Sequence, residues 1–369
     1  MTSPPNPTDY PLGYAHERDP FAPGLLQALP EPPRNIVLLK ASRIGDFINT
    51  TPAIRALHHA LPQARISVIT LPMLIDLAVR LPYVHRALPF PGYPGLADQF
   101  FDARSALAFM QQMQSEEIDL AVQIQGTGVY SNPFMLMLGA KHTAGFIRAD
   151  DPPGRLSAVL PWPTTGHEIR RNLALTSFLG VPEAGLKPDF PLLPEDHAAA
   201  EHWLEGVPQP WIGIHTSARD RTRRWPVERF AAAAAQIQKR MGGTVILLGE
   251  QRDREEMEAA ITATGAPFRN LAGCTTLHIT GAVIQRLAIF LTNDTGPAHI
   301  AYAVGAPTVT VFGGGEPARN GPIFDGPFRV AAFDVECRPC ETGDCPIAFH
   351  CLQQVSVERV VTLAEQVML

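Results

Sequence analysis

Apolar runs of strand length alternate with helix-like patterns along most of this 369-residue chain, and this alternation limits the possible folds more than any other feature. The first series places strands at 36–39, 66–69, 84–88, 120–124 and 143–146, with helices near 47–61, 74–80, 103–115 and 132–138. Such alternation is typical of a parallel sheet covered by helices on both faces. The sequence therefore predicts the α/β class.

A second alternating series follows a stretch, 180–194, that lacks periodicity and is broken by glycine and proline, as interdomain linkers are. The second series comprises helices at 195–205, 227–240, 252–264 and 279–286, strands at 211–215, 245–248, 287–291 and 308–312, a helix from Pro297, and a final helix at 357–368. We therefore expect one Rossmann-like domain over 34–185 and a second over 195–355. Residues 1–33 are rich in proline and are predicted to form a tail that buries too little to order itself.

Composition excludes several classes of protein. With 46% hydrophobic residues, the chain is long enough for two cores. A net charge of only −6 argues against nucleic-acid binding. No apolar run approaches the length of a membrane span, and the start lacks the pattern of a signal peptide, so we expect a cytoplasmic protein.

The segment 294–299 connects an apolar strand to an apolar helix and has the residues of an anion site. Gly296 lets the backbone approach a ligand, and Pro297 suits the first turn of a helix, whose N–H groups and dipole favour phosphate. Asp294 and His299 add an acceptor and a titratable donor beside it. The alternative is an ordinary strand-to-helix turn that Asp294 caps.

Residues 293–301, with 305–309 and 312–313, resemble the C-terminal signature of glycosyltransferase family 9, the ADP-heptose:lipopolysaccharide heptosyltransferases. Residues 39–53 are similar to the opening strand and loop of that family. Arg223-Arg224-Trp225-Pro226 and the cysteines near the end look most like heptosyltransferase II. The resemblance implies the GT-B fold, in which two Rossmann-like domains face each other across a cleft, with the helix at 356–369 joining the first domain.

Four arginines stand in six positions after the strand at 211–215, namely Arg219, Arg221, Arg223 and Arg224. A diphosphate leaving group needs its charge neutralised, and arginine forks can do this without a metal ion. A solvated basic loop is the alternative. The resemblance places Arg223 where the family commonly has lysine, and adds Ser217 to the donor site.

By the same resemblance, Thr295 and Gly296 bind the donor phosphates, Asp294 faces the sugar hydroxyls, and Asp253 accepts from the ribose. Asp253, like Glu250, has an equal alternative as a charge at a helix N-terminus. A buried, hydrogen-bonded structural histidine is the alternative for His299.

The resemblance assigns the acceptor and the catalytic base to the first domain. Asp46 matches the base of an inverting transfer, in which one carboxylate takes the acceptor proton; a helix cap is its alternative role. Gln125 and Gly126 look like the acceptor-side loop. The implied partners are ADP-heptose and a lipopolysaccharide core acceptor at the inner face of the cytoplasmic membrane, so the enzyme is expected in the cytoplasm or peripheral to that membrane.

Four of the five cysteines, Cys337, Cys340, Cys345 and Cys351, lie within fifteen residues. In a reducing compartment, clustered thiolates suit a structural zinc or iron site, with free thiols or adventitious disulfides as alternatives. The resemblance implies that catalysis itself requires no cofactor.

The sequence thus predicts a metal-independent, inverting heptosyltransferase. Alternatives are a family 9 enzyme that uses another nucleotide sugar or acceptor, and a non-catalytic nucleotide-sugar-binding protein. A Rossmann oxidoreductase is disfavoured because the G-x-G-x-x-G pattern is absent.

Overall fold

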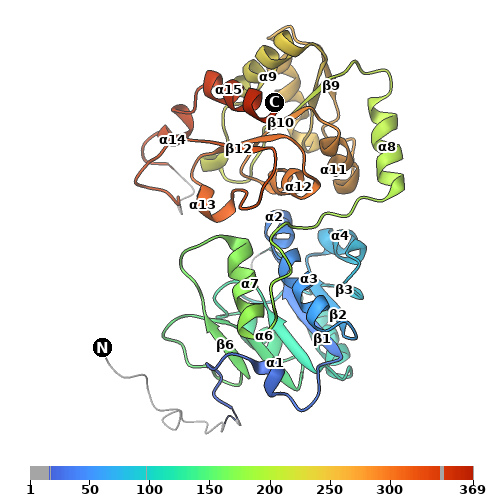
Figure 1. Cartoon of the computed structure of the whole chain (residues 1–369), viewed down its shortest axis with the longest axis vertical. Helices are drawn as coiled ribbons and strands as arrows, with labels where there is room; N and C mark the ends of the chain where they lie inside the picture. Colours follow the sequence, from blue (N-terminus) through green and yellow to red (C-terminus); the bar gives the residue numbers. More distant parts are fainter. Residues whose placement is uncertain (1–15, 17, 97, 341–344, 369) are drawn as a thin grey trace. The chain divides into compact units, whose positions relative to one another are not determined.

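The computed structural model describes residues 16, 18–96, 98–340 and 345–368, and its contacts divide the chain into two compact units (Figure 1). Unit 1 contains the described residues up to Arg43, then Thr50–Thr164 and Ile169–Gly185. Unit 2 contains Ile44–Asn49, Thr165–Glu168 and the described residues from Leu186 onward. The final passage between the units, at Gly185, falls inside the predicted linker.

Unit 1 is built on a six-stranded parallel sheet of order β3-β2-β1-β4-β5-β6. Its strands are β1 (Asn35–Lys40), β2 (Arg65–Thr70), β3 (Arg86–Pro89), β4 (Leu120–Gln123), β5 (His142–Ile147) and β6 (Ala158–Pro161). Its helices are α1 (Leu25–Ala28), α3 (Thr51–Ala60), η2 (Pro72–Leu74), α4 (Ile75–Arg80), α5 (Ala103–Gln114), α6 (Ser131–Leu136) and α7, which begins in unit 2 (Glu168–Phe178). The central strands are buried on both faces, as their continuous apolar runs predict.

Unit 2 repeats this plan with the order β12-β11-β10-β7-β8-β9, again all parallel. Its strands are β7 (Trp211–His215), β8 (Thr244–Leu247), β9 (Phe268–Asn270), β10 (Ile289–Asn293), β11 (Thr308–Phe312) and β12 (Phe328–Ala332). Its helices are α2 (Ile44–Ile48), α8 (Pro194–Leu204), η3 (Arg221–Arg223), α9 (Val227–Met241), η4 (Gln251–Asp253), α10 (Arg254–Thr262), α11 (Leu277–Gln285), α12 (Gly296–Val304), α13 (Pro317–Asn320), α14 (His350–Gln353) and α15 (Val357–Met368). Each unit has the strand order of a Rossmann domain, so the α/β prediction with two Rossmann-like units is confirmed.

Part of the predicted tail packs onto unit 1. Leu25 of α1 is buried, and the backbone N–H groups of Gly24 and Leu26 donate to the carbonyls of Phe178 and Leu179. Val159 of β6 donates its N–H to the carbonyl of Pro20. This stretch of the predicted tail is therefore ordered by packing on the surface of unit 1, where the end of α7 supplies partners that local composition does not reveal. The first fifteen residues lie outside the described ranges.

The single helix predicted at 47–61 is two helices, α2 and α3, which belong to different units. Pro52 stands at the start of α3. A proline has no N–H to donate to the carbonyl four residues earlier, and its ring clashes with that carbonyl, so one continuous helix cannot form here. This break lets α2 pack in unit 2 while α3 covers the sheet of unit 1.

The final helix, α15, differs from the prediction that it joins the first domain. In the structure it packs on α9 and on β10, β11 and β12 of unit 2. Its buried residues, Val360, Val361, Leu363 and Ala364, belong to the hydrophobic core of that unit. The apolar face of α15 is thus already used by the second sheet. No helix in the described ranges is both long and apolar enough to cross a bilayer.

We expect Leu363→Ala to lower the free energy of unfolding by about 2–5 kcal/mol, because it leaves a cavity in a packed core. Hydrogen exchange should accelerate in α9 and β11, and exchange in β1 and β4 should stay unchanged. Thr362→Ala, at an exposed position of the same helix, is the control. Faster exchange confined to the first sheet would contradict the observed packing of α15.

Candidate active site

The carboxyl ends of β7, β10 and β11 carry most of the predicted donor-site residues. These strands are parallel neighbours, so the loops that follow them lie along one edge of the sheet. The arginine loop, defined here as residues 216–224, follows β7, and Asp294 follows β10 directly. The glycine loop, residues 313–315, follows β11. Parallel pairing therefore brings together segments that lie far apart in the sequence.

Asn293, the last residue of β10, ties together both ends of the arginine loop. Its Nδ2 donates to the carbonyl of Thr216 at 2.7 Å, and its Oδ1 accepts from the backbone N–H of Trp225 at 3.0 Å. Asn293 is fully buried, and its amide provides the donor and the acceptor for these two contacts on separate atoms. No role was predicted for Asn293, although a buried polar residue at the end of an apolar strand must find such partners.

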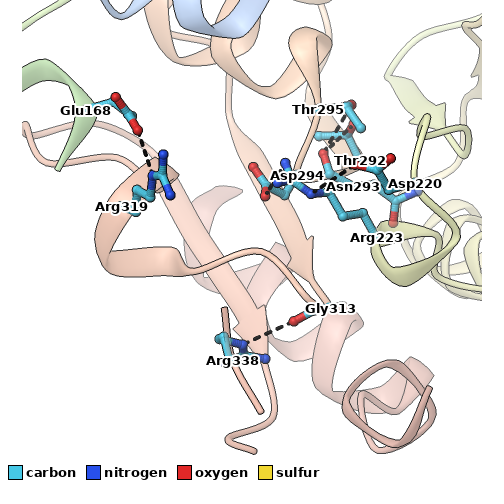
Figure 2. A network of polar contacts seen from close by, with 10 residues as sticks. All are labelled: Glu168, Asp220, Arg223, Thr292, Asn293, Asp294, Thr295, Gly313, Arg319 and Arg338. Atoms are coloured by element: carbon cyan, nitrogen blue, oxygen red, sulfur yellow. Dashed lines mark hydrogen bonds and ion pairs between the residues drawn. The ribbon is translucent and has the colours of Figure 1, made fainter. Parts of the chain in front are cut away.

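Arg223 and Asp294 form an ion pair between the arginine loop and β10 (Figure 2). Arg223 Nη1 donates to Asp294 Oδ2 at 3.1 Å. The Asp294 side chain is 1% exposed, and its Oδ1 has no hydrogen-bond partner among the described residues. Burial raises the pKa of Asp294 to about 6, with the Arg223 charge opposing this rise and the Asp46 charge adding to it. A buried acceptor with one oxygen unused is suited to a polar ligand.

The start of α12 supplies backbone donors next to this pair. Thr295 is the extended N-cap residue, and Pro297 stands in the first turn, where a missing N–H costs nothing. The helix ends at Gly305, whose φ of 76° is the left-handed conformation that glycine adopts readily. The first N–H groups of a helix and its dipole attract anions, as predicted for Gly296.

His299 of α12 is buried against α2. A Cβ on Gly45 would lie 2.5 Å from His299 Cδ2, so only glycine fits there. The pKa of His299 is lowered to about 4, mainly by burial and also by the charges of His167 and Arg223, while the Glu168 charge opposes the shift. His299 is therefore neutral at physiological pH, and the packing favours the structural role that the sequence analysis left open.

Asp46 lies on α2 and its side chain is exposed. Its charge is close enough to Asp294 to raise the pKa of that carboxyl group. Asp46 was predicted to belong to the first domain, but α2 belongs to unit 2. Gly45 is helical, and its missing side chain makes room for His299.

Ser217 lies beside a histidine that the sequence analysis missed. Ser217 Oγ is 3.2 Å from Nε2 of His215, and Thr292 Oγ1 is 3.4 Å from its Nδ1. Burial lowers the pKa of His215 to about 4, and the charge of Asp253 opposes this shift. A neutral imidazole therefore orients the Ser217 hydroxyl. The sequence signal that could have identified His215 is its position as the last residue of β7.

Asp253 acts locally as a cap. Its Oδ2 accepts from the backbone N–H of Glu250 at 2.9 Å, and its side chain is 13% exposed. Glu250 is exposed and pairs with Arg252 at 3.0 Å. This contact supports the alternative role of Asp253 at a helix N-terminus. A contact between Asp253 and the ribose stays a prediction.

Glu168 and His167 hold α13, which follows the glycine loop. Glu168 Oε1 accepts from Arg319 Nε at 2.6 Å, and the Glu168 side chain is 8% exposed (Figure 2). His167 Nε2 lies 2.6 Å from the carbonyl oxygen of Gly321. The Arg319 charge also lowers the pKa of Asp294. Neither Glu168 nor Arg319 was predicted to belong to the site, since no local pattern links positions this far apart.

In unit 1, the predicted acceptor residues follow β4. Gln125 Oε1 accepts from Ala41 N–H at 2.6 Å, and its Nε2 donates to the Ala41 carbonyl at 3.1 Å. Gly126 is exposed, with a φ of 60°, and a Cβ there would meet no atom within 4 Å. Gln125 therefore joins the ends of β1 and β4, while Gly126 leaves the surface open.

The cysteines do not assemble a metal site in the described part of the chain. No group of three or more His, Cys, Asp or Glu side chains there could hold a metal ion. Cys351 is buried in the core of unit 2, whereas Cys337 is exposed. Cys345 Sγ accepts from the backbone N–H of Phe349 at 3.1 Å. The predicted structural zinc or iron site at Cys337, Cys340, Cys345 and Cys351 is therefore not supported.

Residues 106–348 match the family model of glycosyltransferase family 9 (heptosyltransferase). The chain belongs to this family. It is therefore a glycosyltransferase, and its two Rossmann-like units are those of the GT-B type.

Comparisons with individual family 9 proteins agree with this assignment. The chain is 27% identical over 350 residues to lipopolysaccharide heptosyltransferase 2 of Escherichia coli, covering 88% of this chain and 96% of the relative. A family 9 structure from Veillonella parvula matches with a TM-score of 0.77 at 20% identity, over 91% of this chain and 97% of the other. The E. coli heptosyltransferase WaaC with ADP matches with a TM-score of 0.68 at 19% identity, over 90% and 99%.

The buried His299 should make the stability of the protein depend on pH. An unfolded histidine binds a proton near pH 6.5, whereas folded His299 does so only near pH 4, so unfolding takes up a proton between these values. Stability contributed by this residue is thus lost as the pH falls through this window. We expect His299→Gln to reduce the slope of the free energy of unfolding against pH in this window by up to about 1.4 kcal/mol per pH unit.

Urea unfolding at intervals between pH 4 and 8 would measure this effect. His59→Gln, at an exposed position of α3, is the matched control and should leave the curve unchanged. Parallel curves for wild type and His299→Gln would show that His299 is not held neutral by burial.

Proposed function

We propose that this protein transfers heptose from ADP-heptose to an inner-core lipopolysaccharide acceptor, with inversion at the anomeric carbon and without a metal ion. The observation that carries the proposal is Asp294, a buried carboxylate paired with Arg223 on one oxygen and lacking a partner among the described residues on the other. It lies directly before the N-cap residue of α12, and the charge of Asp46 is close enough to raise its pKa. Unit 2 thus contains groups that can bind the donor phosphates, bind the donor sugar and act as the base.

Arg223 and the first N–H groups of α12 are the proposed phosphate ligands. The Arg223 side chain is 35% exposed, so its remaining donors can reach a ligand. Positive charge and backbone N–H groups stabilise the negative charge that grows on the leaving diphosphate. This arrangement supports transfer without a divalent ion. Ser217 and Thr295 are proposed to add hydroxyl groups to the donor site, and Asp253 is the proposed ribose acceptor.

Asp46 is the proposed general base. An inverting transfer needs one carboxylate to take the proton of the acceptor hydroxyl while that oxygen attacks the anomeric carbon and ADP leaves from the opposite face. Asp46 is exposed and can meet an acceptor, whereas Asp294 is buried. The unpaired Oδ1 of Asp294 is the proposed acceptor of a donor-sugar hydroxyl.

The relatives support the choice of donor and acceptor. One similar structure contains ADP, and a curated relative is named a lipopolysaccharide heptosyltransferase. We therefore propose an ADP-linked donor and a lipopolysaccharide acceptor for this chain, with Gln125 and Gly126 on the acceptor side. Because the acceptor is linked to a lipid, we propose that the enzyme acts at the inner face of the cytoplasmic membrane. Two alternatives are a transferase that uses another nucleotide sugar and a protein that binds a nucleotide sugar without catalysis. Nucleotide preference and transfer activity distinguish them.

We expect ADP to bind with the same affinity in the presence and absence of EDTA, because Arg223 and α12 neutralise the diphosphate. Isothermal titration calorimetry would measure the affinity, and thermal shifts with ADP, UDP and GDP would report nucleotide preference. Loss of ADP binding on chelation would contradict metal independence. A larger shift with UDP or GDP would indicate a different donor.

We expect Asp46→Asn to lower the rate of transfer by roughly 10²–10⁴-fold while ADP affinity stays nearly unchanged, because the base acts on the acceptor. Arg223→Ala should weaken ADP binding by roughly ten- to a hundredfold and lower turnover as well. A coupled assay of ADP release with calorimetry would separate the two effects.

The exposed residues Asp325 and Arg269 provide matched controls as Asp325→Asn and Arg269→Ala. Full activity of Asp46→Asn would exclude Asp46 as the base. Equal loss of ADP affinity in Asp46→Asn and Arg223→Ala would instead favour a purely structural role for Asp46.

A further inference from the structure

Arg338 is an arginine with a largely buried side chain that the proposed mechanism does not use. Its side chain is only 8% exposed, and its Nε donates to the carbonyl of Gly313 at 3.1 Å (Figure 2). Its Nη2 donates to the carbonyl of Phe333 at 2.8 Å, and its Nη1 lies 3.5 Å from Asp334 Oδ1. The guanidinium is therefore fixed at three points, one of which is the glycine loop at the end of β11.

The glycine loop connects this guanidinium to the arginine loop. The carbonyl of Gly314 accepts from the N–H of Cys340 at 2.8 Å, and the N–H of Gly314 donates to the carbonyl of Thr222 at 2.7 Å. Thr222 is buried and directly precedes Arg223. A Cβ on Gly313 would lie 2.3 Å from the Thr222 carbonyl oxygen. Two hydrogen-bond steps thus lead from Arg338 to the backbone that carries Arg223.

A second set of contacts holds the arginine loop against the same C-terminal segment. The guanidinium of Arg221 lies 5.6 Å from the ring centre of Phe349. The indole N–H of Trp225 donates to the carbonyl of Val355 at 3.0 Å. Residues 333–355, where described, therefore support the arginine loop both before and after Arg223.

We propose that Arg338 is a positioning residue for the donor diphosphate, acting through Gly313, Gly314 and Thr222 to fix Arg223. The proposal rests on the proposed function of Arg223 as a phosphate ligand. Arg338 reaches the site through backbone atoms and contacts no group that we assign to the ligand. Its planar fork sets the direction of each hydrogen bond, which the flexible ammonium of a lysine cannot reproduce.

The test compares Arg338→Gln and Arg338→Lys with Arg329→Gln, an exposed arginine of β12 in the same unit. Hydrogen exchange of the free protein should be faster at 216–224 in Arg338→Gln, intermediate in Arg338→Lys and unchanged in the control. ADP affinity should fall roughly tenfold in Arg338→Gln, with KM for the donor raised more than kcat is lowered. Arg338→Gln combined with Arg223→Ala should bind ADP no more weakly than Arg223→Ala alone, because both act through one contact.

Unchanged exchange at 216–224 in a folded Arg338→Gln protein would overturn the proposal. Additive losses of ADP affinity in the double variant would also overturn it, since they would mean that Arg338 acts independently of Arg223. If Arg338→Gln does not fold, the exchange and affinity of Arg338→Lys decide by the same criteria. Failure of wild-type protein to bind ADP would reject the proposed function, while the exchange result would still decide whether Arg338 fixes the loop.

Discussion

The ion pair between Arg223 and Asp294 is the interaction on which the rest of the site depends. Moving a carboxylate out of water costs several kcal/mol unless a counter-charge and hydrogen bonds compensate. At Asp294 that compensation comes from a loop belonging to a different strand, so the loop must take a defined position for the carboxylate to stay buried. Asn293 and Gly314 make this position reproducible by fixing the loop backbone. The fold and the charge of the site are therefore determined together.

The sequence allowed most of the fold to be predicted, because strands buried on both faces have continuous apolar runs. The ranges 211–215, 308–312 and 357–368 agree with β7, β11 and α15 to the residue. The edge strands β6, β9 and β12 were missed, since each is only partly buried and β6 and β9 have only four and three residues. The strand expected at 287–291 is displaced to β10 at 289–293 because Thr292 and Asn293 are polar yet buried.

The site was predictable only where local sequence carries the chemistry. Arginine density and the Asp294–Gly296 turn indicated two halves of a donor site, and the structure brings Arg223 and Asp294 within 3.1 Å. Asn293, His215 and Glu168 could not be assigned, since their roles depend on partners distant in the chain. The cysteine spacing suggested a metal, but spacing does not reveal that Cys351 packs into a core while Cys337 faces solvent.

The contact between Gly45 and His299 affects how this enzyme could be recombined with its relatives. Residues 44–49 and 165–168 pack with the second unit although the residues around them belong to the first. A chimera joined once, at residue 185, would pair the Gly45 helix of one parent with the histidine helix of another. Any bulkier residue at position 45 would then collide with the imidazole. A chimera that keeps the second unit of this protein intact therefore requires three inherited pieces, two of which are only a few residues long.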